Sequence, residues 1–154
     1  MATRTEREGV EAGSSRGGSS SPFLRVALPW PKRELWPNGR PKHWGARLRL
    51  SSHYRETARL LTLLELRGRR VDGLAEREID VELEIAPPVA TKNGRRNVAV
   101  PDVDNVVAAV KHGLDGIAEA LRVNDRAFRL ATPRFVDRCP QGEVRVLLSI
   151  GGSA

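Results

Sequence analysis

The sequence predicts a single α+β domain in which a small mixed β-sheet packs against two main helices. Apolar and acidic residues alternate over Glu78–Pro88, which is the pattern of a strand with one face in water. Apolar residues recur at helical spacing from Val103 to Leu121 and, less regularly, from Trp44 to Leu64. The chain of 154 residues is long enough for one such domain and too short for a second of similar size.

Residues 1–22 are expected to be a disordered tail, and residues 23–151 are expected to form the domain. Gly and Ser dominate residues 11–21, and such a segment buries too little apolar surface to offset its chain entropy. The N-terminus lacks the apolar core of a secretory signal, and no apolar run approaches the ~20 residues of a membrane span. We therefore expect a cytoplasmic protein that does not contact a membrane.

The first half of the domain is expected to contain a strand, a loop and a long helix. Phe23–Leu28 has the apolar density of a strand. The next residues carry four prolines, an Asn-Gly pair and three tryptophans, which indicates a loop. A helix is expected from Trp44 onward, and its apolar or small positions are Trp44, Leu48, Ser51, Tyr54, Ala58, Leu61 and Leu64.

The second half continues with a strand, a helix and two further strands. Glu78–Pro88 is the clearest strand, and Val89–Val100 is expected to be a basic loop or the tip of a hairpin. An amphipathic helix is predicted from Asp102 or Val103 to Leu121. Phe128–Val136 and Glu143–Ile150 are strand candidates, and the residues between them, "DRCPQGE", suggest a hairpin. The predicted order is therefore β-α-β-α-β-β.

Positive charge is concentrated near the start of the domain. The chain carries a net charge of +7, and between Leu24 and Arg49 the only acidic residue is Glu34. The basic residues in this stretch are Arg25, Lys32, Arg33, Arg40, Lys42, Arg47 and Arg49. Such a concentration is typical of a surface that binds a polyanion, although a coding sequence rich in G and C also enriches arginine. Trp30, Trp36 and Trp44 lie among these charges, either as packing residues or as base-stacking groups.

An acidic cluster lies at the start of the second predicted helix. Asp102, Asp104 and Asn105 precede its apolar stripe, and one aspartate there could simply cap the helix. Two carboxylates ~4 Å apart repel by roughly 1 to 4 kcal/mol, and a divalent cation reverses that cost. Oxygen ligands favour Mg²⁺ or Mn²⁺ over zinc. The single cysteine, Cys139, excludes an internal disulfide and a multi-cysteine zinc site.

These motifs resemble those of a known family. "PDVDN", a helix of about twenty residues and "RVNDRAF" resemble the signature of the RusA-type Holliday junction resolvases, and "LPWPKRELWPNGRPKHW" is similar to a segment of many phage-encoded members. The resemblance extends from Phe23 to Ile150. It matches Asp102 and Asp104 to the paired metal-binding carboxylates of the family and Asp125 to the third.

The sequence departs from the family pattern at two positions. The catalytic lysine that the family often places one turn after the second aspartate is replaced by Ala108, and Lys111, seven residues after Asp104, is the catalytic candidate that remains. Asn124 occupies the position of the acidic residue that commonly precedes the third aspartate.

The resemblance implies a homodimeric, Mg²⁺-dependent endonuclease, with Mn²⁺ as an alternative metal, that resolves four-way DNA junctions by paired nicks in DNA recombination and repair. It implies no small-molecule substrate. A non-catalytic, structure-specific DNA-binding protein descended from a prophage resolvase is the alternative, and an RNA-binding module is a third, less favoured one. The residues expected to contact DNA are Lys32, Arg33, Arg40, Lys42, Arg95 and Arg96.

The apolar surface of the two helices also predicts a homodimer, because a small sheet is too narrow to cover all of it. The alternative is a monomer whose sheet covers both helices. The apolar residues concerned are Val103, Val107, Val110, Leu114, Ile117 and Leu121 on one helix and Leu60, Leu61, Leu63, Leu64 and Leu66 on the other.

Overall fold

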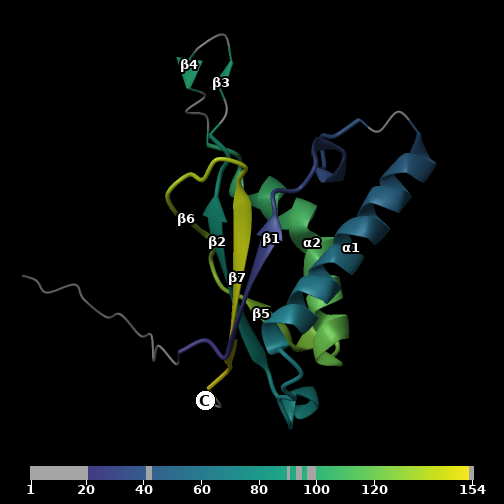
Figure 1. The fold of residues 1–154 in the computed structure, drawn as a ribbon, viewed down its shortest axis with the longest axis vertical. Helices are drawn as coiled ribbons and strands as arrows, with labels where there is room; N and C mark the ends of the chain where they lie inside the picture. Colours follow the sequence, from purple (N-terminus) through teal and green to yellow (C-terminus); the bar gives the residue numbers. More distant parts are fainter. Residues whose placement is uncertain (1–20, 41–42, 90, 93–94, 97–99, 153–154) are drawn as a thin grey trace, which may run out of the picture.

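The computed structural model describes residues 21–40, 43–89, 91–92, 95–96 and 100–152, and residues 91–92 and 95–96 by their backbone alone. The elements are β1 (Leu24–Pro29), η1 (Arg33–Leu35), α1 (Trp44–Leu66), η2 (Leu74–Glu76), β2 (Ile79–Ala86), β3 (Thr91–Lys92), β4 (Arg95–Arg96), α2 (Val103–Leu121), η3 (Asp125–Ala127), β5 (Phe128–Leu130), β6 (Arg134–Phe135) and β7 (Glu143–Ile150). The predicted class, an α+β fold with a mixed sheet and two long helices, is confirmed (Figure 1).

The main sheet has the strand order β1-β7-β2-β5, and β6 pairs with β2 as well. β7 is antiparallel to both of its neighbours, β1 and β2. β5 and β6 are parallel to β2 and pair with its first and last parts, respectively. The short strands β5 and β6 therefore share one edge of the sheet, and β1 forms the other.

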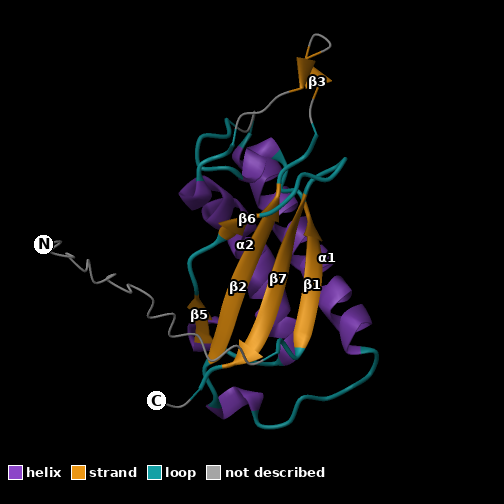
Figure 2. Ribbon diagram, turned by 90° about the vertical axis from the view of Figure 1, so that its left-hand side faces the viewer, coloured by secondary structure: helices purple, strands orange, loops and turns teal. Residues whose placement is uncertain are grey.

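Both long helices cover the same face of this sheet, as Figure 2 shows, with α1 beside β1 and α2 behind β2. The alternation in β2 decides which side chains reach that face, because Ile79, Val81, Leu83 and Ile85 are fully buried. The opposite face carries the acidic residues of β2. There Glu84 forms ion pairs with Arg134 of β6 and with Arg145 of β7, the latter at 3.9 Å.

The two helices run in the same direction and touch closely at two glycines. Gly113 of α2 lies against Tyr54 of α1, and a Cβ atom on Gly116 would lie only 2.1 Å from the carbonyl oxygen of Arg55. Arg55 also pairs with Glu119, at 2.9 Å, across the helix contact. Because later residues of α1 contact later residues of α2, the helices begin at the same end of the molecule.

The predicted buried face of α1 is only partly correct. Ser51, Tyr54 and Ala58 are buried, whereas Trp44, Leu48 and Leu64 are 80%, 54% and 69% exposed. The close approach of α2 selects small or polar residues at the contact, and one of them is Thr62, whose hydroxyl donates to the Ala58 carbonyl oxygen at 2.7 Å. A pattern based on hydrophobicity scores small and polar residues low even when they are buried. The predicted buried face of α1 was therefore shifted toward leucines that are exposed to solvent.

The hairpin predicted at Asp137–Glu143 is wrong. β6 and β7 lie on opposite sides of β2, so the connecting segment crosses the end of that strand instead of forming a tight turn. It pairs there with the residues after β2, since the Cys139 N–H donates to the Pro87 carbonyl oxygen at 3.2 Å. The single strand predicted over Phe128–Val136 is two short strands, and the hairpin expected within Val89–Val100 is present as β3 and β4.

Candidate metal centre and nucleic-acid surface

Asp102 is the N-cap of α2. Its backbone is extended, with φ −65° and ψ 129°, and its side chain accepts a hydrogen bond from the Asp104 N–H at 3.0 Å. Its carbonyl oxygen accepts the first helical bond from the Val106 N–H at 3.1 Å. The capping role considered for this residue is therefore present. It engages one carboxylate oxygen and leaves the other available.

Asp104 lies in the first turn of α2 and is exposed, as Asp102 is. In the part of the chain that the structure describes, neither carboxylate forms an ion pair. The Asp104 side chain has no capping role either. Among the described residues, two carboxylates therefore lie at one helix mouth with no positively charged side chain paired to either, in a chain with a net charge of +7.

Asp125 lies at the other end of α2. It begins η3, just after the helix ends at Leu121, and is exposed. The length of α2 separates it from Asp102 by about 27 Å within one chain. In the described residues, no group of three or more His, Cys, Asp or Glu side chains is close enough to hold a metal ion. One chain thus brings together Asp102 and Asp104 but not Asp125.

The residues at the two departures from the family pattern also have defined places. Ala108 and Lys111 are exposed on the same side of α2 as Asp104, with Lys111 about 10 Å further along the helix axis. The side chain of Asn124 caps η3, where it accepts a hydrogen bond from the Arg126 N–H at 2.9 Å. Asn124 therefore holds the turn that presents Asp125.

The basic residues predicted to contact DNA lie mainly at the end of the molecule where α2 begins. Lys32, Arg33 and Arg40 are exposed in and around η1. Arg95 and Arg96 form β4, and the β3–β4 hairpin extends beyond the sheet at this same end (Figure 1). Lys42 lies outside the described residues. These described basic segments therefore lie at the same end of the molecule as the acidic pair.

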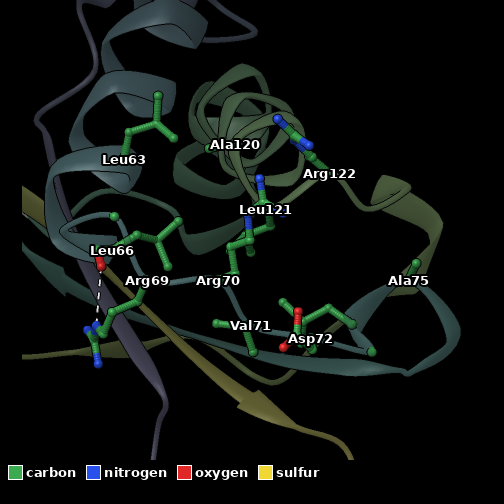
Figure 3. Close-up of a pocket in the computed structure, with 13 residues that line it drawn as sticks. Leu63, Leu66, Arg69, Arg70, Val71, Asp72, Ala75, Ala120, Leu121 and Arg122 are labelled. Atoms are coloured by element: carbon green, nitrogen blue, oxygen red, sulfur yellow. Dashed lines mark hydrogen bonds between the residues drawn. The ribbon is translucent and has the colours of Figure 1, made fainter.

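A cavity at the opposite end was not anticipated from the sequence. It has a volume of about 390 Å³ and lies between the C-terminal ends of α1 and α2 and the loop that follows α1 (Figure 3). Arg70 and Arg122 contribute guanidinium groups, and Leu63, Leu66 and Leu121 contribute apolar wall. The signal in the sequence was the run "RGRR" at residues 67–70, three residues of which are arginine. This cavity places further positive charge at the Asp125 end of α2.

Comparison with known proteins adds one relative. No protein-family model matches the chain. The chain is 34% identical over 108 residues to an uncharacterized protein of Xylella fastidiosa (strain Temecula1), a match that covers 67% of this chain and 61% of that protein. The chain thus spans about three fifths of the length of its relative. In the described residues, no helix is long and apolar enough to cross a membrane.

Proposed function

We propose that this protein is a metal-dependent endonuclease that cuts branched DNA, with the four-way junction as its substrate, as the resemblance to the RusA-type resolvases implies. The observation that carries the proposal is the pair of exposed carboxylates, Asp102 and Asp104, which have no ion-pair partner in the described residues. The pair lies at the end of the molecule that also carries Lys32, Arg33 and Arg40. A polyanion is attracted to the basic residues, and a divalent cation offsets the repulsion between its phosphates and the carboxylates.

The residues that would hold the metal are Asp102, Asp104 and Asp125. Their oxygen ligands suit Mg²⁺ or Mn²⁺, and a bound Mg²⁺ supplies charge stabilisation and a more acidic water for hydrolysis of a phosphodiester. Asp102 and Asp104 are both exposed at the helix mouth, and the helix cap uses only Oδ1 of Asp102, so the pair is accessible to a hydrated cation. Lys111 is too far along α2 to contact the same ligands and is better placed to pair with a neighbouring phosphate of the DNA.

A second copy of the chain would complete the set of carboxylates. A two-fold axis that runs beside the middle of α2, perpendicular to the helix, brings the Asp102 end of one helix beside the Asp125 end of the other. The sheet edge next to α2 supports such a contact, because Leu130 and Phe135 are 42% and 37% exposed there. Both are in register with core residues of β2, Val81 and Ile85, so they belong to the helix-covered side of the sheet. This arrangement has the two-chain stoichiometry expected from the sequence, but it uses the sheet edge and not the helix stripes from which the dimer was expected, because Val110, Ile117 and Leu66 are buried within one chain. Its two composite sites were not part of that expectation.

The alternative is a DNA-binding protein without catalytic activity. It is favoured by the 27 Å separation if the chain does not dimerise in this way, since about 27 Å exceeds the span of any metal site. It is also favoured by Ala108, which lacks the amine expected at that position.

Nicking of a synthetic four-way junction tests the proposal. The full chain is incubated with a labelled junction in Mg²⁺, in Mn²⁺, in Ca²⁺ and in EDTA, and a linear duplex of the same sequence serves as the control substrate. We expect paired nicks in Mg²⁺ on the junction alone. Tight binding to the junction with no nicks in either Mg²⁺ or Mn²⁺ would support the non-catalytic alternative instead.

A further inference from the structure

The structure separates the three tryptophans of the chain into two kinds. Trp30 and Trp36 are half-buried against the core, and their ring centroids are 5.7 Å apart with the planes tilted by 46°. The indole N–H of Trp36 donates to the Pro31 carbonyl oxygen at 3.1 Å, which fixes that ring in the loop. These two residues therefore hold the loop before α1 against the domain.

Trp44 is different, because 80% of its surface is exposed. It is the first residue of α1, and Leu48, one turn later on the same side, is 54% exposed. Tryptophan is rarely left in water, since its ring has a large apolar surface. The two side chains form a small apolar patch that no described segment of this chain covers.

The surroundings of this patch favour a nucleic acid as its occupant. Arg40, Arg47 and Arg49 lie close to Trp44 in the sequence, and no acidic residue occurs between Glu34 and Glu56. Such a combination of an exposed aromatic ring and arginines suits a single-stranded nucleotide, whose base stacks while its phosphate pairs with positive charge.

The patch also lies at the same end of the molecule as the candidate metal centre. α1 and α2 run in the same direction, and they touch at Tyr54 and Gly113. Trp44 and Asp104 each precede that contact by about 15 Å along their own helix axis. Figure 1 shows that the two helices diverge toward these ends, so one bound DNA junction would contact Trp44 and the carboxylates on separate parts of the same end of the molecule.

We propose that Trp44 stacks on an unpaired base of the bound DNA, at the same end of the molecule as the candidate metal centre. This inference rests on the proposed function for the position of the scissile bond, but the stacking itself does not require catalysis. The bases of a four-way junction are all paired, but in an open junction the pairs at the branch point are stacked on one side only. Unpairing a base there therefore costs less than in a continuous duplex. Trp44 would thus contribute to the preference for branched DNA.

Base stacking can be measured without cleavage by comparing two oligonucleotides in EDTA. One is a ten-nucleotide oligothymidylate, and the other is an abasic strand with the same phosphates and no bases. We expect the natural protein to bind oligothymidylate roughly tenfold more tightly, because stacking is sequence-tolerant but needs a base. Trp44→Ala should remove that preference and leave the affinity for the abasic strand unchanged, while Trp44→Phe should keep most of it.

Leu64→Ala is the matched control, since Leu64 is an exposed apolar residue at the far end of the same helix. This variant should prefer oligothymidylate over the abasic strand as strongly as the natural protein does. The proposal is overturned if Trp44→Ala still prefers oligothymidylate over the abasic strand, or if it weakens binding to both strands equally. It is also overturned if light scattering shows that the substitution converts a dimer into a monomer. Loss of the base preference in Trp44→Ala, in a protein that never nicks a junction, would reject the nuclease and retain the stacking site.

Discussion

Asp102 has one role that the structure shows and one that we propose, and a single substitution separates them. Asn caps a helix about as well as Asp, so Asp102→Asn should keep the hydrogen bond to the Asp104 N–H and leave the stability nearly unchanged. It removes one negative metal ligand, and we expect junction cleavage to fall below detection. Junction affinity should stay equal or rise, because less negative charge then faces the phosphates. Cleavage, gel-shift binding and urea unfolding of the same preparation check the three parts.

Asp104→Asn extends this test to a residue without a capping role. We expect the same loss of cleavage and the same retained affinity, with no change in the midpoint of urea unfolding beyond that of a surface substitution. If both variants still nick the junction at the natural rate, the pair has no metal role and helix capping is the full account of Asp102.

At the scale of elements, the contact between α1 and α2 can be tested at one glycine. Gly116→Ala places a methyl group 2.1 Å from the Arg55 carbonyl oxygen, and backbone atoms cannot move away as a flexible side chain can. We expect a loss of about 1 to 3 kcal/mol in the free energy of unfolding, from overpacking. Gly45→Ala is the matched control, because it also lies in a helix but has nothing within 4 Å of the added methyl. It should instead stabilise the protein by roughly 0.5 to 1 kcal/mol, and equal effects in urea unfolding would contradict the proposed close contact.

Elements with a strong local signal were predictable from the sequence, and those decided by distant partners were not. The predicted helix from Asp102 or Val103 to Leu121 is confirmed. The capping aspartate marks its start, and the regular spacing of apolar residues continues to its end. The alternation in β2 is likewise confirmed. The hairpin between β6 and β7 was mispredicted because nothing local indicates that β2 lies between them. The exposure of Trp44 and Leu48 depends on where α2 begins to touch α1, which is also a tertiary property.

For the candidate site, the sequence correctly placed Asp102 and Asp104 at the start of α2. The large distance between this pair and Asp125 was not predicted. The length of the helix between them already dictates the separation. A sequence motif gives the order of its residues but not whether they meet within one chain or between two chains. The three-dimensional structure is needed to show that Asp125 of the same chain lies too far away. The arginines around the cavity at the Asp125 end were missed for a related reason, since they come from two separate segments.

At the scale of the whole molecule, composite sites predict complementation between two inactive variants. Asp102→Asn and Asp125→Asn should each be inactive as a homodimer. A mixed dimer of the two retains one intact site, formed by Asp102 of one chain and Asp125 of the other. After unfolding and refolding together in equal amounts, about a quarter of the sites should be active, and they should give single nicks. If each chain carried its own complete site, the mixture would remain inactive.

Light scattering checks the assembly itself. We expect about 34 kDa, twice the 17.0 kDa of the chain, at micromolar concentration. A monomer under these conditions, together with an inactive mixture, would contradict the composite site.

The charge distribution predicts a steep dependence of DNA affinity on salt. If about six of the basic residues meet phosphates, the junction affinity should fall by roughly a thousandfold between 50 and 200 mM salt. Replacing Lys32, Arg33 and Arg40 together by Ala should reduce the slope by about three. An unchanged slope in this triple variant, measured by anisotropy, would show that these residues face away from the DNA.

The place of β7 in the sheet governs when this protein can fold during its synthesis. β7 pairs with β1 on one side and with β2 on the other, yet it follows both along the chain and so leaves the ribosome after them. Until residues 143–150 have left the ribosome, β1 has no strand to pair with. The apolar faces of α1 and α2 are then only partly covered, because the central strand of the sheet is missing. A shortened translation product that ends before β7 should therefore be degraded as an unfolded chain. It should not accumulate as a folded fragment.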